Sequence, residues 1–237
     1  MINTLNEGFK QLKIPYNDEI ERKFIKYCDL LKEWNQKINI TSIDDDEDIY
    51  VKHFLDSVLL MNEENYNEEK NIIDVGTGGG FPGLPLKIVN NNYKVTLLDS
   101  LRKRIDFLTI VTNELLLDNV EFIHGRAEDF GQNKNYREKY DICVSRAVAP
   151  LNVLSEYCLP FVKKGGYFAA YKSENISFEI EISENAIKKL GGIVKEIKEI
   201  KLPETDIIRK IVIVEKIEST DKKYPRKAGK PSKEPLV

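Results

Sequence analysis

Apolar residues in the first quarter of the chain recur every three to four positions. The positions that carry this spacing are Phe24, Tyr27, Cys28, Leu31 and Trp34. Such a period is typical of one buried helix face. A polar, acidic bend is expected over residues 44–48, and a further helix is expected through residues 53–61. The pattern therefore predicts a helical N-terminal extension over residues 1–65.

From residue 71 onward, short apolar runs alternate with helical patterns. Strands are expected at 71–75, 94–98, 120–123, 140–145 and 166–171, and helices at 83–90, 101–116, 150–162 and 177–190. Alternation of this kind predicts a parallel sheet with helices on both faces. The ligand crevice of such a sheet lies beyond the carboxyl ends of its strands.

Residues 71–83 carry the sequence Asn-Ile-Ile-Asp-Val-Gly-Thr-Gly-Gly-Gly-Phe-Pro-Gly, which predicts a buried strand, a glycine turn and a helix start. Glycines let the backbone approach a ligand, and a new helix offers unpaired N–H groups. Asp99 ends the next strand, where a carboxylate can bind ribose hydroxyls. Capping of the following helix is the alternative role for Asp99. The combination predicts a nucleoside site.

Two cofactors fit this loop. Residues 78–83 match the Gly-x-Gly-x-x-Gly fingerprint of dinucleotide-binding proteins, and residues 74–80 match the Asp-Val-Gly-x-Gly-x-Gly loop of S-adenosylmethionine (SAM) methyltransferases. Asp74 suits the cationic amino group of a methionine moiety and would repel a pyrophosphate. Pro82 removes an N–H that phosphate binding would use. Both residues favour SAM over a dinucleotide or a purely structural turn.

The final two strands, expected at 193–201 and 207–216, are joined by a link so short that they must pair antiparallel. A parallel sheet that ends in an antiparallel hairpin is typical of class I SAM-dependent methyltransferases. The expected fold class is therefore α/β, with a mostly parallel, seven-stranded, Rossmann-like sheet. We expect a SAM-binding methyltransferase domain over residues 66–217 and a basic C-terminal tail over residues 218–237.

The net charge of −3 gives no general attraction to nucleic acid, but the charge is unevenly placed. The tail is rich in cations: Lys222, Lys223, Arg226, Lys227, Lys230 and Lys233 stand against Asp221 and Glu234. This run predicts an edge that faces a polyanion, with a solvated, frayed terminus as the alternative. The candidate RNA contacts are Arg104, Arg226, Lys227 and Lys230.

Cys28, Cys143 and Cys158 are far apart and lack C-x-x-C spacing, so neither a disulfide framework nor a metal site is predicted. The chain opens without a charged-then-apolar leader. No apolar run approaches the ~20 residues of a membrane span. We therefore expect a cytoplasmic protein that does not act at a membrane.

Several polar residues follow the later strands. Residues 125–129 offer a backbone amide and a carboxylate near an adenine, or form an ordinary acidic surface loop. Arg146 ends the fourth strand and Lys172 follows the fifth, where either can face a substrate. His53 acts on the substrate or packs as a structural residue. The candidate catalytic residues are Arg146, Lys172 and His53.

Segments spread along the chain resemble the bacterial 16S ribosomal RNA (guanine-N7) methyltransferases historically called glucose-inhibited division protein B. They are residues 34–35, 39–41, 53–57, 74–83, 97–100, 103–104 and 145–147, and the tail sequence Tyr-Pro-Arg-Lys-Ala-Gly-Lys-Pro at 224–231. The similarity runs from about residue 30 to the tail. It implies SAM as the cofactor and guanine-527, in the decoding-region loop of 16S rRNA, as the substrate.

The resemblance carries over cofactor contacts to Gly76, Phe81, Ala127, Glu128 and Arg146. Together with the residues argued above, the candidate cofactor site comprises Asp74, Gly76, Gly78, Phe81, Asp99, Ala127, Glu128 and Arg146. The partner is 16S rRNA as free RNA, as the 30S subunit or as an assembly intermediate, and the chain is expected to be a monomer without a protein partner. A NAD(P)-dependent oxidoreductase and a non-catalytic SAM-binding RNA-binding protein stay open as alternatives.

Overall fold

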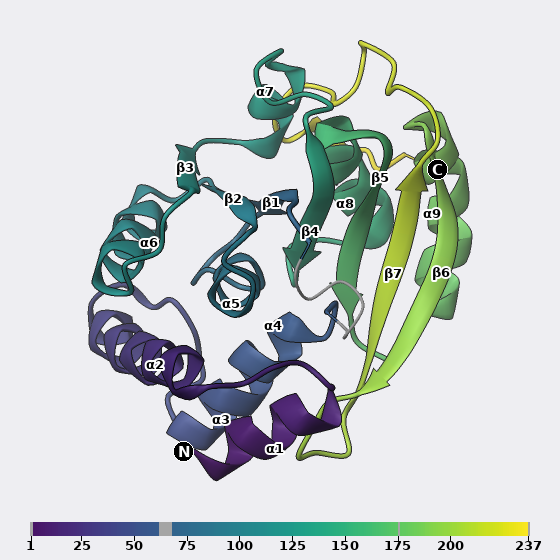
Figure 1. The fold of residues 1–237 in the computed structure, drawn as a ribbon. Coiled ribbons are helices and arrows are strands. Elements are labelled where there is room, and N and C mark those ends of the chain that lie inside the picture. Colours follow the sequence, from purple (N-terminus) through teal and green to yellow (C-terminus); the bar gives the residue numbers. More distant parts are fainter. Residues whose placement is uncertain (1, 62–67, 175, 237) are drawn as a thin grey trace.

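The computed structural model describes residues 2–61, 68–174 and 176–236. Within them, seven strands form one sheet in the order β3-β2-β1-β4-β5-β7-β6 (Figure 1). The strands are β1 (Asn71–Val75), β2 (Lys94–Asp99), β3 (Val120–His124), β4 (Tyr140–Arg146), β5 (Val162–Lys172), β6 (Gly192–Lys201) and β7 (Ile208–Lys216). Neighbouring strands from β3 to β5 pair in parallel, whereas β7 pairs antiparallel with both β5 and β6. The expected fold class is confirmed.

Helices flank the sheet and also precede it. The helices of the N-terminal extension are α1 (Asn3–Gln11), α2 (Asp18–Ile38), α3 (Asp46–Ile49), the π-helix η1 (Tyr50–Leu55) and α4 (Asp56–Val58). The later helices are α5 (Gly83–Val89), α6 (Arg102–Glu114), α7 (Ala127–Gln132), α8 (Leu151–Cys158), the 3₁₀ turn η2 (Leu159–Phe161), α9 (Ser177–Lys189) and α10 (Lys230–Lys233). Among the described residues, no helix is both long and apolar enough to span a membrane.

Local chemistry sets the ends of the long helix α2. The side chain of Asn17 accepts hydrogen bonds from the amides of Glu19 and Ile20, which satisfies two of the unpaired N–H groups at the helix start. Asn39 ends the helix in the left-handed region, at φ 48°. Asparagine tolerates that conformation better than most residues.

Two expected non-helical segments are helical. The acidic bend contains α3, because Asp45 caps the amide of Asp48 and acidic side chains in a first turn favour a helix. The expected loop at 125–129 contains the start of α7, which carries Glu128 and Asp129 in its first turn. Both corrections have one cause: acidic residues indicate a helix start as readily as a solvated loop.

The sheet separates two apolar cores. Ile72 of β1 and Leu97 of β2 belong to the core on one face, which also contains the N-terminal helices together with α5 and α6. The next residues along these strands, Ile73 and Leu98, belong to the core on the other face, with α7, α8 and α9. This division follows from the two-residue period of a strand. The helical extension therefore shares a continuous core with one face of the sheet.

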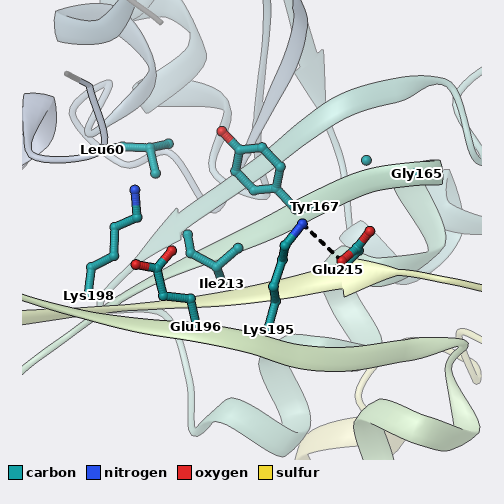
Figure 2. A pocket seen from close by; sticks show the side chains of 9 residues that line it. Leu60, Gly165, Tyr167, Lys195, Glu196, Lys198, Ile213 and Glu215 are labelled. Carbon is teal, nitrogen blue, oxygen red and sulfur yellow. Dashed lines mark ion pairs between the residues drawn. The ribbon is translucent and has the colours of Figure 1, made fainter. Parts of the chain in front are cut away.

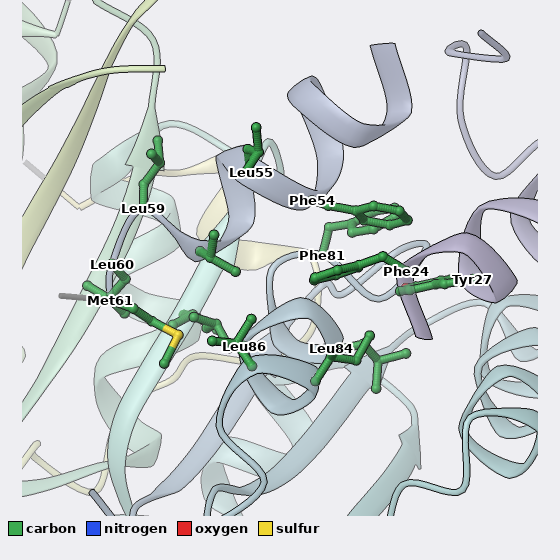
Figure 3. Close-up of a cluster of buried hydrophobic side chains, with 14 of the residues drawn as sticks. Phe24, Tyr27, Phe54, Leu55, Leu59, Leu60, Met61, Phe81, Leu84 and Leu86 are labelled. Carbon is green, nitrogen blue, oxygen red and sulfur yellow. The ribbon is translucent and has the colours of Figure 1, made fainter. Parts of the chain in front are cut away.

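Aromatic side chains join the extension to the glycine loop. Figure 3 shows Phe24, Tyr27 and Phe54 of the extension packed around Phe81. The Phe24 and Phe54 rings stack at 4.7 Å, and the Tyr27 and Phe81 rings stack at 5.5 Å. Burial of one such ring contributes about 1.5–3 kcal/mol. The domain boundary expected at residues 65/66 lies outside the described residues, and the N-terminal helices before it are packed against the domain.

Candidate cofactor and substrate site

Two adjoining cavities lie at the carboxyl ends of the central strands. The larger, of about 790 Å³, is lined by residues from the extension, the glycine loop, β4, β5, β7 and α9. The smaller, of about 270 Å³, is lined by the ends of β1, β2 and β4 and by α7 and α8. Gly76, Arg104 and Ala147 line both. Ala147 has a positive φ of 57°, a strained conformation of the kind found at functional sites.

The glycine loop holds its shape through backbone conformations that other residues resist. Gly76 and Gly78 have φ values of 72° and 61°. A β-carbon on Gly76 would lie 2.6 Å from the Val148 side chain. The amides of Gly76 and Thr77 donate to the carbonyl of Leu98. The loop is thereby tied to the end of β2.

Asp74 is fully buried beneath this loop. Its Oδ2 accepts hydrogen bonds of 2.8 Å from the Thr77 hydroxyl and from the Gly83 amide. Its Oδ1 has no hydrogen-bond partner among the described residues. Burial raises the pKa of Asp74 to about 7, against the lowering effect of its hydrogen bonds. A cation brought to Oδ1 would compensate for the lost hydration, and the expected contact with an amino group stays a prediction.

Both carboxylate oxygens of Asp99 accept hydrogen bonds within the protein. Oδ2 accepts from the Gly78 amide at 2.9 Å and from Arg104 Nη1 at 3.2 Å, while Oδ1 accepts from the Leu101 amide at 2.9 Å. A carboxylate has about four lone-pair sites. One acceptor position is therefore left for a ribose hydroxyl, and that role stays a prediction. Arg104, expected to contact RNA, lies at the junction of the two cavities and pairs with Asp99.

Phe81 forms an aromatic wall of the larger cavity. The His53 ring stacks on it at 4.5 Å with an interplanar angle of 7°. The Arg146 guanidinium lies 5.2 Å from the centre of the same ring. The structure thus brings together three residues that the sequence analysis selected separately.

His53 has no free lone pair in this arrangement. Its Nδ1 lies 3.1 Å from Arg146 Nη2, and its Nε2 lies 2.8 Å from the Thr41 hydroxyl. Because a guanidinium only donates, we assign Nδ1 as the acceptor and place the proton on Nε2. Burial, with a contribution from Arg146, lowers the pKa of His53 to about 3. The neutral ring orients Arg146 and is not placed to accept a proton from a substrate.

The two pKa shifts act on stability in opposite directions. The pKa of His53 falls below its ordinary value of 6.5, so its contribution is present above pH 6.5 and is lost as pH falls toward 3. The pKa of Asp74 rises above its ordinary value of 3.8, so its contribution is present below that pH and is lost as pH rises through 7. Between about pH 4 and 6.5 the two effects oppose each other.

A buried carboxylate bridges two of the arginines that line the larger cavity, Arg146 and Arg209. Asp56 Oδ2 accepts from Arg146 Nη1 at 2.7 Å, and Asp56 Oδ1 accepts from Arg209 Nε at 2.8 Å. Arg146 Nη1 also donates to the carbonyl of Lys52 at 3.2 Å. With the bond to His53, contacts within residues 2–61, 68–174 and 176–236 use three of the five N–H groups of Arg146, which leaves two for a ligand.

The sequence analysis gave no role to Asp56 or Arg209. His53 lies in the π-helix η1, and Asp56 begins the short helix α4 three residues later. Such π-helical turns recur at functional sites. The spacing of Asp56 from His53 was the only signal in the sequence that could have pointed to Asp56. No signal in the sequence pointed to Arg209 on β7, because its partner Asp56 lies 153 residues away in the chain.

Lys172 lines the larger cavity as a paired cation. Its Nζ donates to Glu179 Oε1 at 2.6 Å and to the carbonyl of Ala149 at 2.9 Å. A catalytic role for Lys172 stays a prediction. Ala127 and Glu128, at the start of α7, are buried and line the smaller cavity together with Tyr157 of α8.

A sequence model of the family described as rRNA small subunit methyltransferase G matches residues 20–209. The chain belongs to this family. The ribosomal RNA small subunit methyltransferase G of Alkaliphilus oremlandii is 55% identical over 232 residues, which cover 98% of this chain and 97% of the relative. That of Clostridium botulinum (strain Loch Maree / Type A3) is 47% identical over 234 residues, or 99% and 98% of the two chains. The resemblance found in the sequence is confirmed.

Solved structures share the fold of this methyltransferase G family member. The fibrillarin pre-rRNA processing protein of Methanococcus jannaschii aligns with a TM-score of 0.52 at 15% identity, over 69% of this chain and 74% of that one. TYW2 of M. jannaschii, determined in complex with AdoMet, aligns with a TM-score of 0.50 at 18% identity, over 64% and 71%. At these identities the likeness concerns the fold alone.

The C-terminal tail of this methyltransferase G family member is folded, not frayed. Tyr224 is buried in the core beside α7 and α8. The Arg226 guanidinium pairs with the fully buried Glu156 at 2.6 Å, so the ion pair occupies the group that we expected to contact RNA. We therefore leave Arg226 out of the proposed RNA contacts. Lys227 and Lys230 are exposed and stay in them.

A third cavity lies apart from this site. Figure 2 shows it beside β5, β6 and β7, with Lys195 paired to Glu215 at 3.1 Å. It has a volume of about 200 Å³ and reaches Gly165, near the start of β5, whereas the site of this methyltransferase G family member uses the other end of that strand. None of the candidate residues lines it.

Proposed function

We propose that this protein transfers a methyl group from SAM to N7 of guanine-527 in 16S rRNA. Membership of the methyltransferase G family supports the reaction and the class of substrate. The observation that carries the proposal is the pair of adjoining cavities that meet at the glycine loop. The smaller has the walls that a nucleoside requires, and the larger gathers cations around an aromatic face.

The residues at the glycine loop fit the cofactor. Asp74 keeps a buried carboxylate oxygen that accepts no hydrogen bond from the described part of the chain, and a carboxylate there would suit an ammonium group. Gly76 and Gly78 hold the backbone in conformations that leave room for a ligand. Asp99 retains an acceptor for a ribose hydroxyl, and Ala127 and Glu128 would stand at the adenine. When bound, SAM supplies a methyl group on a cationic sulfur.

The chemistry requires positioning and no proton transfer to the enzyme. Guanine N7 already carries a lone pair, so direct displacement on the methyl group needs no general base. The occupied lone pair of His53 and the paired ammonium of Lys172 agree with this requirement. Orienting two reactants can contribute about 7–11 kcal/mol to the lowering of the barrier. Phe81 stays a candidate wall of this cavity, although His53, Tyr27 and Arg146 already contact its ring.

Arg146 is proposed to bind the methionine carboxylate, guanine O6 or an adjacent phosphate through its two remaining N–H groups. The common bidentate contact of Arg with guanine O6 and N7 would occupy the nucleophilic lone pair, so Arg146 does not use it in the reacting complex. An Arg146→Ala variant should lose turnover even at saturating RNA and SAM. Full turnover of that variant would refute this role.

The rRNA must present an unstacked guanine. Ribosomal loops allow a base to be splayed out, as base-modifying enzymes require. Lys52, Arg146 and Arg209 line the larger cavity and favour an anionic backbone at its mouth. Lys227 and Lys230 on the tail would bind phosphates, which makes binding depend steeply on salt. We assign the reaction to a monomer in the cytoplasm.

The test is methyl transfer from labelled SAM to 30S subunits prepared from a strain that lacks the endogenous enzyme. Nuclease mapping should place the label on N7 of guanine-527. Free 16S rRNA and an assembly intermediate, assayed in parallel, identify the preferred form of the substrate. Label on another nucleotide would keep the reaction and refute the position.

Two alternative functions give different results in the same assay. A non-catalytic RNA-binding protein would bind SAM in a calorimeter and transfer no label. A NAD(P)-dependent oxidoreductase would bind the dinucleotide and not SAM. The antiparallel strand β7 between β5 and β6 departs from the all-parallel dinucleotide domain and disfavours the second alternative.

A further inference from the structure

The C-terminal segment of residues 218–236, called the tail strap below, folds back over α7 and α8. Gln132 donates to the carbonyls of Lys222 and Pro225 at 3.0 and 2.8 Å. Arg137 donates to the carbonyl of Tyr224 at 2.7 Å. These donors bind backbone carbonyls of the strap, so they fix its path independently of the charges on its side chains.

The first anchor of the strap is a buried ion pair. Arg226 Nε lies 2.9 Å from Glu156 Oε1, and Nη2 lies 2.6 Å from Oε2. The backbone amide of Arg226 also donates to Oε1 at 2.8 Å. The Glu156 side chain is fully buried, whereas 18% of the Arg226 side chain is exposed. A buried carboxylate requires such a partner, so Arg226 and α8 hold each other in place.

The second anchor reaches the smaller cavity itself. The amide of Gly229 donates to Glu128 Oε1 at 2.8 Å. Gly229 has a φ of 81°, which turns the strap so that its N–H points to α7. Glu128 lines the smaller cavity, and so does Tyr157, the neighbour of Glu156 on α8. The second anchor therefore holds Glu128, which lines the cavity, and the first holds Glu156, the residue next to the lining residue Tyr157.

We propose that the tail strap is a positioning element of the cofactor cavity, with Arg226 and Gly229 as its positioning residues. They fix α8 and α7 at the separation that the adenosine half of the cofactor requires. The inference rests on the proposed function, because it concerns the affinity for SAM. The cations of the tail then have two different roles, since Arg226 supports the cofactor cavity whereas Lys227 and Lys230 bind the RNA.

Two neighbouring substitutions test this division, since Arg226→Ala and Lys227→Ala each remove one positive charge from the same turn of chain. We expect Arg226→Ala to weaken SAM binding by roughly tenfold, because Glu156 loses its side-chain partner and α8 is no longer held at the cavity. Lys227→Ala should leave the SAM affinity unchanged and weaken RNA binding. Arg226→Lys should restore part of the SAM affinity. Calorimetry at a temperature where every variant is folded gives these values.

Kinetics separate positioning from general stability. With Arg226→Ala, the KM for SAM should rise while kcat at saturating SAM stays near that of the unaltered protein. If Arg226→Ala fails to fold, deletion of residues 229–237 removes the Gly229 amide and leaves the first anchor intact. A Lys230→Ala/Lys233→Ala/Glu234→Ala variant controls for the side-chain charges lost in that deletion. The deletion should weaken SAM binding, and the control should not.

Three outcomes are distinguishable. SAM binding to the unaltered protein, weakened by Arg226→Ala and by the deletion but not by their controls, supports the inference. Equal SAM affinity of the unaltered protein and of Arg226→Ala, or an equal loss with Lys227→Ala, overturns it and leaves the proposed function standing. Absence of SAM binding to the unaltered protein refutes the proposed function itself.

Discussion

Asp56→Asn is the most informative single substitution in the larger cavity. Asp56 accepts from Arg146 and Arg209 on its two oxygens, and its side chain is 4% exposed. Asn keeps the shape and one acceptor but places an NH₂ group where the second acceptor stood. One guanidinium would then face a donor, and both would lose their counter-charge.

The size of the effect follows from burial. Removing one partner of a buried ion pair costs about 3–5 kcal/mol. The two arginine side chains are 13% and 26% exposed, so water reaches both and we expect the lower end, about 3 kcal/mol. For a chain of this length, each kcal/mol lowers Tm by roughly 2–4 °C. The expected decrease is therefore roughly 6–12 °C.

The assay combines thermal unfolding with single-turnover methyl transfer. Because Arg146 loses one of its orienting partners, we expect the rate of transfer to fall by about 10²-fold at saturating substrates. Asp48→Asn, in α3, is the matched control, because Asp48 is also an aspartate of the extension that pairs with a cation. Its pair with Lys52 spans 2.7 Å, but the two side chains are 46% and 36% exposed, so about 0–1 kcal/mol is expected.

Two results would refute the reasoning. A Tm for Asp56→Asn equal to that of Asp48→Asn would show that the buried bridge contributes no more than a surface pair. A normal rate of transfer despite a lowered Tm would show that Asp56 stabilises the fold without orienting Arg146.

Three further predictions concern pH, salt and the glycine loop. His53→Gln removes one of two opposed titrations, so its unfolding free energy should rise relative to that of the unaltered protein by about 1.4 kcal/mol per unit as pH falls from 6.5 to 4; equal slopes in urea melts would contradict a neutral, buried ring. The double variant Lys227→Ala/Lys230→Ala should reduce the slope of log affinity for RNA against log salt by about 1.4, if each lysine binds one phosphate of a single strand; an unchanged slope would remove the tail from the RNA surface. Tyr27→Phe leaves the buried carbonyl of Gly79 without its donor. The free energy of unfolding should fall by about 1–3 kcal/mol, and SAM binding should weaken. A calorimetric SAM affinity equal to that of the unaltered protein would show that the hydrogen bond from α2 does not support the cofactor-binding shape of the glycine loop.

Much of the fold could be predicted from the sequence, because its signals are local. A two-residue period indicates a strand, and the short link between 193–201 and 207–216 dictates an antiparallel pair. The positions of Gly76 and Gly78 after a buried strand indicate the nucleoside loop through backbone sterics alone. The same locality explains the errors at 44–48 and 125–129, where acidic residues suit a loop and a helix start equally.

The partners of charged side chains could not be predicted, because they depend on which distant segments meet. Asp56 joins Arg146 to Arg209 only because β4 and β7 both flank β5 and the extension packs beside them. Arg226 and Lys227 are adjacent cations in the sequence, yet burial against Glu156 gives the first a structural partner and leaves the second to solvent. A sequence determines how many charges a chain carries, but the dielectric and the counter-charge around each one exist only after folding.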